Sequence, residues 1–515
     1  MDKATRLCSK RTYENALKLL ETRRRKARPK SSHVGNGISS PQVAIKPSAK
    51  SGSPLRGTPS LTGMKDWLQK IGYTDRDIAA LNIVHVAGTK GKGSTCAFVR
   101  SLLQQYGRRT GFPKKIGLYT SPDLTCIRER IQINGTPISE DLFTKYFYDI
   151  WDRLFERHAE DENTQQPRYL QFLLLLAIHT FCQEGTQAAI IETHHGGEYD
   201  ATNVVSAPVV TGITSIGLDH LAQLGPTIQD VAWHKAGIFK NGSLAFSSPQ
   251  DPEVEAVLRS RAEEKGVQLE IVDVDHSLAA DANVLRAPVQ RINCSLAIAL
   301  VNGFLSRKSP TEEKGLQWED IERGIEHFSW PGRFEIIKTP KCAWYLDGAH
   351  NELSIGQAVQ WFAEMTRGSS ARVSSCMVIF SHISEERDGP SLLRALARAL
   401  SENDIRCPEM VFTTYQERRD GEVRLDKTLK PPEDESLRAL PKQYSDMWRT
   451  LQLEARTRYE SSIEEALEYA DRVGSERDGG LQVLVTGSLH LVGGALYLLR
   501  RRTTDDSRIG CGTQS

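Results

Sequence analysis

The sequence predicts an α/β protein with two domains, and three observations support this prediction. Short apolar strands alternate with helix-like stretches over most of the chain, which is the pattern of parallel βαβ units. The alternation occurs in two series, and the turn signal Pro331-Gly332 stands between them. A chain of 515 residues is also long enough for more than one domain with its own core. We expect one domain over about 61–328 and a second over 329–503.

Residues 1–60 are expected to hold a short helix and a low-complexity segment. Tyr13, Leu17 and Leu20 are spaced like one apolar helix face, so we expect a helix near 12–24. Residues from about 27 to 60 are rich in Ser, Pro, Gly and Lys, and we expect them to be disordered because they offer little apolar surface to bury. The basic run at 23–26 fits either a mitochondrial presequence or a solvated helix end.

Short apolar runs bounded by polar or Gly-containing residues mark the expected strands of both domains. The first domain is expected to contain helices over Met64–Ile71 and Ser94–Tyr106, and strands over 82–86, Ala188–Ile191 and Pro208–Ile216. The second is expected to contain strands over Ala343–Leu346, Met377–Ser381 and Gln482–Thr486, with a helix over Pro390–Leu400. Residues about 404–457 are charged and irregular, so we interpret them as an insertion, and we expect 504–515 to be a disordered tail.

The composition excludes several classes of protein. With 66 Lys and Arg against 65 Asp and Glu, the net charge of +1 gives no electrostatic reason to bind nucleic acid or an anionic membrane. No apolar run approaches the roughly 18–20 residues that a membrane-spanning helix needs. The nine cysteines are scattered without a CxxC pair. We therefore expect reduced thiols in an intracellular protein, not a disulfide scaffold or a zinc module.

The strongest local signal is the loop Gly88–Thr95, which lies between an apolar strand and a helix. In this setting small residues let backbone N–H groups approach phosphate oxygens, and the helix N-terminus adds partial positive charge. We expect Lys92 to neutralise the phosphates and Ser94 or Thr95 to supply a hydroxyl near a metal. Gly93 separates Lys92 from these hydroxyls, so the strict Walker A spacing is not kept. The alternative interpretation is an exposed Gly/Lys-rich turn.

This loop and three further motifs resemble the folylpolyglutamate synthases of eukaryotic, fungal type, which belong to the Mur-ligase superfamily of ATP-dependent amide ligases. The motifs are Leu118–Pro122, Arg128–Gly135 and Tyr345–Asn351, and the resemblance covers about 61–500. It implies an N-terminal P-loop-type ATPase domain with a mostly parallel sheet and a smaller C-terminal Rossmann-like α/β domain. It also implies ATP-dependent addition of L-glutamate to the γ-carboxyl of tetrahydrofolate and its polyglutamates through an acyl phosphate, with release of ADP and phosphate.

Three other functions stay open. They are a dihydrofolate synthase, a paralogous ligase acting on a non-folate carboxylic acid, and a nucleotide-binding protein without catalysis. For any of the ligases the resemblance implies ATP and Mg²⁺ as cofactors, with a monovalent cation as a further candidate. It implies folate and glutamate as partners of a monomer that is cytoplasmic, with the mitochondrion as a second candidate compartment.

The resemblance assigns roles to individual residues. The ATP contacts it implies are Gly88, Thr89, Gly91, Lys92, Gly93, Ser94, Thr95, Gln290, Asn293, Arg333 and Asp347. The metal ligands it implies are Ser121, Glu192 and His220, of which Glu192 ends an apolar strand. Lys235 matches a lysine that is carbamylated in some members. His350 and Ser488 would bind glutamate, and Lys92, Lys235, Asp347 and His350 would be catalytic. Each could instead be an ordinary strand-end, turn or ion-paired residue.

The chain departs from the family pattern after Glu192, where Thr193-His194-His195 stands in place of a Gly-rich turn. Val289 and Cys294 also stand where histidine and alanine are usual. We expect His194 and His195 to be pocket-wall residues that reshape the acceptor or phosphate side. The alternatives are extra metal ligands, for which nitrogen donors suit zinc or manganese better than magnesium, and a turn without catalytic effect.

Overall fold

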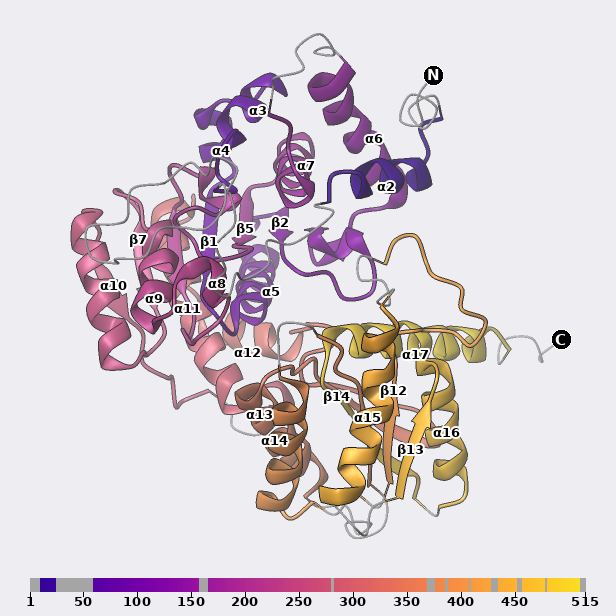
Figure 1. The fold of residues 1–515 in the computed structure, drawn as a ribbon. Helices are drawn as coiled ribbons and strands as arrows, with labels where there is room; N and C mark the ends of the chain where they lie inside the picture. The colour runs from indigo at the N-terminus through magenta and orange to yellow at the C-terminus, as the bar shows by residue number, and fades with distance from the viewer. Residues whose placement is uncertain are drawn as a thin grey trace, which may run out of the picture. The chain divides into compact units, whose positions relative to one another are not determined.

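The computed structural model describes residues 10–24, 59–156, 165–278, 282–367, 376–384, 388–405, 407, 409–427, 434–451, 456–477 and 479–509. The chain forms two compact units, shown as ribbons in Figure 1. Unit 1 comprises Met1–Pro122, Arg128–Ala279 and Pro288–Ser329. Unit 2 comprises Asp123–Ile127, Ala280–Ala287 and Trp330–Ser515. The segment expected to be disordered, about 27–60, lies almost wholly outside the described residues.

Unit 1 is built on an eight-stranded sheet of order β4-β3-β2-β5-β1-β6-β7-β8. Its strands are β1 (Ile83–Ala87), β2 (Ile116–Tyr119), β3 (Ile131–Ile133), β4 (Thr136–Pro137), β5 (Ala188–Glu192), β6 (Val210–Ile213), β7 (Leu244–Ser247) and β8 (Leu269–Ile271). All neighbours pair in parallel except β3, which is antiparallel to both β2 and β4. The predicted mostly parallel sheet is confirmed, and β1 and β5 are buried throughout.

The helices of unit 1 cover this sheet. They are α2 (Tyr13–Glu21), α3 (Met64–Lys70), α4 (Asp75–Ala80), α5 (Lys92–Thr110), α6 (Glu140–Trp151), α7 (Tyr169–Gln183), α8 (Leu221–Leu224), α9 (Ile228–Lys235), α10 (Pro252–Glu264), α11 (Pro288–Lys308) and α12 (Trp318–Glu326). The N-terminal helix forms as predicted: Thr12 caps α2, and Leu17 and Leu20 are buried. The helices α9 and α10 pack beside β7 in one apolar cluster (Figure 1).

Unit 2 is built on a six-stranded sheet of order β13-β12-β11-β14-β10-β9. Its elements are β9 (Glu335–Lys338), β10 (Cys342–Leu346), α13 (Glu352–Thr366), β11 (Cys376–Phe380), α14 (Gly389–Glu402), β12 (Glu409–Thr413), α15 (Glu435–Leu451), β13 (Arg456–Glu460), α16 (Ile463–Ser475), β14 (Leu481–Thr486) and α17 (Leu489–Ile509). Only β9, at one edge, is antiparallel to its neighbour. This is the expected Rossmann-like arrangement.

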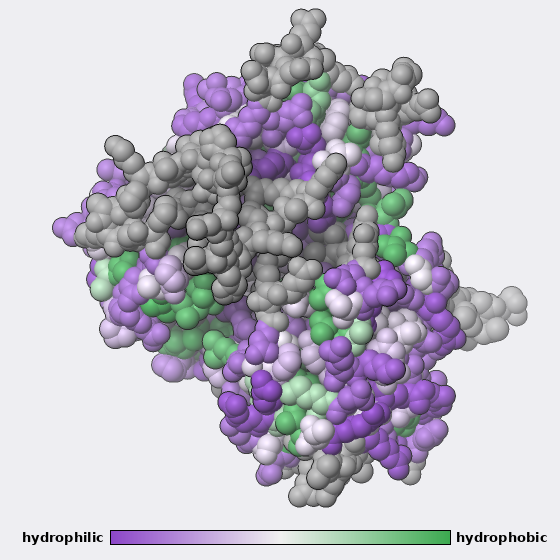
Figure 2. All heavy atoms as spheres, viewed as in Figure 1, coloured by the Kyte–Doolittle hydropathy of each residue, from purple (hydrophilic) through white to green (hydrophobic). Residues whose placement is uncertain are grey.

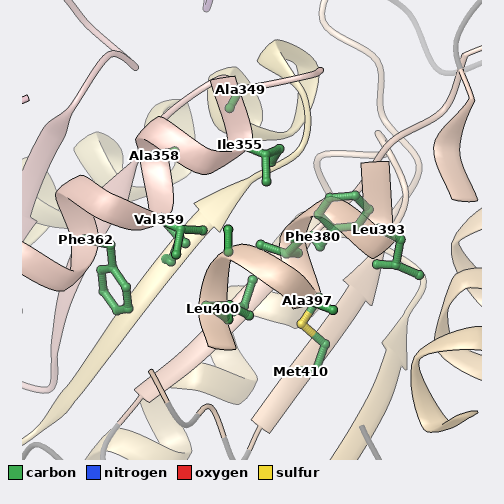
Figure 3. Packing of buried hydrophobic residues seen from close by; sticks show 14 of the residues in the cluster. Ala349, Ile355, Ala358, Val359, Phe362, Phe380, Leu393, Ala397, Leu400 and Met410 are labelled. Atoms are coloured by element: carbon green, nitrogen blue, oxygen red, sulfur yellow. The ribbon is translucent and has the colours of Figure 1, made fainter. Parts of the chain in front are cut away.

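Two apolar clusters form the core of unit 2. One cluster contains Ile355, Val359 and Phe362 of α13, Leu393 of α14 and Phe380 of β11 (Figure 3). In the other, residues of α16 and α17 pack on the strands β10, β11 and β14. Alternate side chains of a strand point to opposite faces of the sheet, and helices bury the apolar residues of both faces.

The structure corrects two expectations about unit 2. The supposed insertion at 404–457 contains β12, which is buried over its whole length between β11 and β13, and the helix α15. Its apolar run is only Met410–Phe412, between Glu409 and two threonines, so the short run did not indicate a strand inside the sheet. The supposed tail at 504–515 begins inside α17, which ends at Ile509.

The residues coloured in Figure 2 are mostly hydrophilic on the visible face, with hydrophobic residues in smaller groups. Among the described residues, every helix is too short or too polar to cross a membrane.

Candidate functional site

The loop Gly88–Thr95 of unit 1 runs from the end of β1 into α5, and we call it the phosphate loop after its predicted role. Its conformation depends on two glycines. Gly88 has φ +148°, and a Cβ there would lie 1.8 Å from Thr214 Oγ1. Gly91 caps α5 with φ +88°, and a Cβ there would lie 2.2 Å from Asn293 Oδ1. Any other residue would be strained and would clash, so the backbone here can approach a ligand closely. Lys92, Gly93, Ser94 and Thr95 form the first turn of α5, two residues earlier than predicted.

Two lysines meet at the start of this loop. Lys92 Nζ donates to the carbonyl oxygen of Gly88 at 3.2 Å, and Lys235 Nζ donates to the same oxygen at 2.6 Å. Lys235 is only 3% exposed. Burial, and then the positive charge of Lys92, lower the pKa of Lys235 well below its usual range. The structure therefore favours an uncharged amine at Lys235.

Glu192 lies at the carboxyl end of β5, where ligand-binding groups of α/β sheets are found. Its Oε1 is 4.0 Å from Lys92 Nζ. Its Oε2 accepts hydrogen bonds from Thr120 Oγ1 and, at 3.2 Å, from the backbone N–H of Ser121. Two of the expected metal ligands, Ser121 and Glu192, are thus brought together. Sequence reasoning missed the neighbouring hydroxyl of Thr120, although the motif that contains it was recognised.

His220 lies on the loop that follows β6, in the left-handed region with φ +51°. Its Nε2 is 3.1 Å from Nδ1 of His195 and 3.8 Å from Oδ2 of Asp219. Thr89, at the start of the phosphate loop, ties this segment in place: its hydroxyl donates to Gly217 O at 3.0 Å. The backbone N–H of Gly217 donates back to the hydroxyl at 3.1 Å.

The oxygen donors gathered here suit Mg²⁺, which prefers carboxylate, hydroxyl, phosphate and water oxygens. Among the residues that the structure describes, no group of three or more His, Cys, Asp or Glu side chains could hold a metal ion alone. Glu192 and Ser121 therefore fit a cation whose coordination nucleotide phosphates and water would complete.

The expectation that His194 forms a pocket wall does not hold. Its side chain is 2% exposed, and its Nε2 lies 2.6 Å from the hydroxyl of Tyr119. Its Nδ1 is 3.3 Å from Oδ1 of Asp200, a buried carboxylate that also accepts hydrogen bonds from Thr202. Although burial opposes ionisation, His194 and these hydrogen bonds lower the pKa of Asp200 below its usual range. His194 is thus part of a buried polar network.

Gln290 and Asn293 lie near the start of α11, and Asn293 contacts the phosphate loop. Asn293 Nδ2 donates to Gln290 Oε1 at 3.0 Å. Thr95 Oγ1 donates to Asn293 Oδ1 at 3.5 Å, and Gly91 packs closely against the same amide.

The remaining expected residues belong to unit 2: Asp347 and His350 follow β10, Ser488 follows the neighbouring strand β14, and Arg333 precedes β9. Asp347 follows β10, and its oxygens accept hydrogen bonds from the backbone N–H groups of Phe334 and Ala349 at 3.1 and 3.0 Å. Burial raises the pKa of Asp347 to about 6, while the positive charge of Arg333 opposes the rise. Ser488 follows β14 and is buried.

Two histidines follow the carboxyl ends of β10 and β11. His350 Nδ1 donates to Gly348 O at 2.8 Å. His382, which follows β11 and is buried, donates from Nδ1 to Gly487 O at 3.0 Å. Sequence reasoning gave His382 no role, although its place just after a predicted strand is a signal for a ligand-binding position.

Comparison with known proteins finds close relatives of this chain. The folylpolyglutamate synthase of Neurospora crassa is 38% identical over 516 residues, covering 97% of this chain and 93% of that protein. The probable folylpolyglutamate synthase of Schizosaccharomyces pombe is 38% identical over 455 residues, covering 85% and 88%. The folylpolyglutamate synthase of Saccharomyces cerevisiae (strain YJM789) is 37% identical over 462 residues, covering 87% of this chain and 82% of that protein. No protein-family model matches the chain.

Solved structures share the fold. The Mycobacterium tuberculosis folylpolyglutamate synthase, complexed with ADP and AMPPCP, has a TM-score of 0.67 at 21% identity, covering 85% of this chain and 95% of that one. The Yersinia pestis bifunctional folylpolyglutamate synthase/dihydrofolate synthase, complexed with AMPPNP and a Mn ion, has a TM-score of 0.62 at 24% identity, covering 85% and 93%.

Proposed function

The chain belongs to the folylpolyglutamate synthase family, and from this premise we propose that it adds L-glutamate to the γ-carboxyl of tetrahydrofolate and its polyglutamates. It is an ATP-dependent ligase that adds glutamate. One observation from its own residues carries the proposal: Lys92, at the N-terminus of α5, lies 4.0 Å from the carboxylate of Glu192, the strand-end residue that Thr120 and Ser121 contact. A phosphate site and a carboxylate able to hold a cation thus share one sheet edge.

The proposed reaction has two steps, with an acyl phosphate between them. A carboxylate oxygen of the acceptor bonds to the γ-phosphorus, and the bond from that phosphorus to ADP breaks. The amine nitrogen of glutamate then bonds to the acyl carbon, the acyl–phosphate bond breaks, and the nitrogen loses a proton. Positive charge is needed in the first step because two anions approach each other. Lys92 and the backbone N–H groups of the loop would supply it.

We assign the other residues of unit 1 as follows. Glu192, Ser121 and His220 would hold divalent cations, which when bound neutralise phosphate charge. Gln290 and Asn293 would contact the nucleotide, because Asn293 packs against the phosphate loop and donates a hydrogen bond to Gln290. Lys235 would react with CO₂ to form a carbamate, since burial and the charge of Lys92 lower the pKa of its amine and so favour the nucleophilic neutral form.

In unit 2, Arg333 and Asp347 would contact ATP, and His350 and Ser488 would bind the incoming glutamate. The support for these roles is that Asp347 and Ser488 follow adjacent parallel strands, paired at Leu346 and Val485. A monomeric state, a cytoplasmic location with the mitochondrion as second compartment, and a monovalent cation are further parts of this proposal.

The test is a glutamate-dependent ADP-release assay on the purified protein, supplied in turn with tetrahydrofolate, dihydropteroate and an unrelated carboxylic acid. We expect release only with tetrahydrofolate and glutamate together, and a product heavier by one glutamyl residue. Turnover of dihydropteroate alone would indicate a dihydrofolate synthase, and turnover of the unrelated acid alone a paralogous ligase. Nucleotide binding without any turnover would overturn the enzymatic assignment.

A further inference from the structure

The two histidines that follow Glu192 are neighbours in sequence but have different surroundings. His194 is buried between Tyr119 and Asp200. His195 is exposed, and its ring packs against that of His220, with centroids 4.4 Å apart and an angle of 70° between the rings. The unusual His-His pair therefore places one imidazole inside the fold and the other beside the proposed cation ligand His220.

The distance between the two ring nitrogens fits a shared ion. His195 Nδ1 and His220 Nε2 are 3.1 Å apart. Imidazole nitrogens bind divalent zinc at about 2.0–2.1 Å, so two adjacent ligands of one ion lie roughly 3.0–3.4 Å from each other. The two nitrogens are thus already spaced as neighbouring ligands would be.

The backbone beneath His195 is held by the same carboxylate that contacts His194. The N–H of His195 donates to Oδ2 of Asp200 at 2.9 Å, while Oδ1 of Asp200 faces His194. Asp200 is itself 2% exposed and further fixed by Thr202. Since metal sites need ligands whose supporting shell is fixed, this arrangement prepares His195 for coordination.

We propose that His195 is a second imidazole ligand, beside His220, for a divalent cation at this site. The inference rests on the proposed function, which makes His220 a cation ligand. Two nitrogen donors favour ions such as Mn²⁺, Co²⁺ or Zn²⁺ over Mg²⁺, which prefers oxygen. Among the described residues, His195 and His220 supply the imidazoles at this place, and phosphate oxygens and water would complete the coordination.

The experiment compares the wild type with His195→Gln and with the matched control His327→Gln, which removes an exposed imidazole outside this loop. Each protein is loaded with Mn²⁺ and a non-hydrolysable ATP analogue, and pulsed EPR counts the imidazole nitrogens bound to Mn²⁺. Calorimetry measures the affinities for Mn²⁺ and Mg²⁺ in the same complex. A second variant, His195→Ala, guards against an unexpected contribution from the glutamine amide.

We expect two bound imidazoles in the wild type and the control, and one in both His195 variants. Loss of His195 should weaken Mn²⁺ binding by about 10-fold or more and Mg²⁺ binding by less than about 3-fold. Equal nitrogen counts in all proteins, or equal losses for both ions, would overturn the proposal. Turnover of wild type with Mg²⁺, tetrahydrofolate and glutamate is measured separately, so failure of the inference and failure of the proposed function remain distinguishable.

Discussion

Lys235 Nζ donates a 2.6 Å hydrogen bond to the carbonyl oxygen of Gly88, the residue at which the phosphate loop leaves β1. This bond ties the end of α9 to the nucleotide-side loop. Lys92 shares the same acceptor at 3.2 Å, so two amines compete for one carbonyl in a buried setting. Electrostatic repulsion and burial both favour the neutral form of Lys235.

A neutral amine at Lys235 predicts that a carbamate forms there. Lys235→Ala should lose at least 10-fold in kcat, and a small added carboxylate should partly restore it. Lys235→Arg should not be restored, because the guanidinium stays cationic. The measurement is the steady-state rate with and without acetate, together with a bicarbonate-dependent mass increase of the wild type. Full activity in Lys235→Arg would rule out the carbamate.

Lys92 is predicted to act on phosphate and not on folding. Lys92→Ala should lower kcat more than 10-fold, which corresponds to more than about 1.4 kcal/mol of transition-state stabilisation. Its unfolding midpoint should stay unchanged, because the side chain fills no core volume. Lys90→Ala, on the same loop, is the control and should lower kcat less than about 3-fold. If the two variants lose equal activity, Lys92 has no special role.

Asp347 should give the reaction an acid limb near pH 6, where its pKa lies. If the carboxylate contacts the nucleotide, kcat/KM for ATP should fall as the pH drops through this value. Arg333→Gln removes the charge that keeps the pKa of Asp347 down, so the limb should move to higher pH; Arg333→Lys should leave it nearly in place. Asp347→Asn should abolish the limb. A limb that stays fixed in Arg333→Gln would separate Asp347 from the pH dependence.

The raised pKa of Asp347 also determines how the stability of the fold changes with pH. The folded protein binds more protons at Asp347 than the unfolded chain between about pH 4 and pH 6. The contribution of Asp347 to folding is therefore fully present below about pH 4 and is lost as the pH rises through about 6. Asp347→Asn should flatten this part of the stability profile, measured by urea unfolding at several pH values.

A change at His194 should affect both acceptor classes equally, because its imidazole contacts the buried side chains of Tyr119 and Asp200. His194→Ala leaves the hydroxyl of Tyr119 and an oxygen of Asp200 with fewer partners, at about 1–3 kcal/mol for each unsatisfied group. Tyr119→Phe, which removes one of these contacts, should cost less. Paired kinetics on folate and non-folate acceptors should show the same fold-change in kcat/KM. A selective change would restore the pocket-wall interpretation.

The sequence predicted the strands whose apolar runs are uninterrupted and the loops that follow them. Glu192 ends such a run and Asp347 follows one, and the resemblance to the family then implied their roles. It did not predict β12, because the apolar run Met410–Phe412 is only three residues long. The burial of β12 between β11 and β13 comes from strand pairing that no local pattern encodes. Nor could the sequence show that His194 is buried while His195 is exposed. Asp200, five residues after His195, contacts the side chain of His194 and the backbone N–H of His195, and no local pattern encodes these contacts.

Glu417 of unit 2 lies in the segment 404–457, which the sequence predicted to be an insertion, and it forms a buried ion-pair cluster there. Its carboxylate is 5% exposed and accepts bonds from Arg424 at 2.9 and 3.1 Å, with Lys427 Nζ at 2.9 Å. Burial alone would raise the pKa of Glu417, but these two cations outweigh it and lower the pKa. Arg424 also donates to Thr125 O at 2.8 Å, so the cluster holds the segment Asp123–Ile127.

Glu417→Gln should therefore leave Lys427 without this carboxylate and Arg424 paired with Asp426, and destabilise unit 2 by about 3–5 kcal/mol. Glu422→Gln is the matched control, since Glu422 is an exposed partner of Arg418 and should cost less than about 1 kcal/mol. Because the folded pKa of Glu417 is depressed, its contribution is present above about pH 4.3 and is lost as the pH falls through the folded value. Hydrogen exchange should accelerate in the peptides that contain Thr125 and Arg424, and urea midpoints give the size of the loss. Equal exchange in the two variants would show that the cluster does not hold the segment.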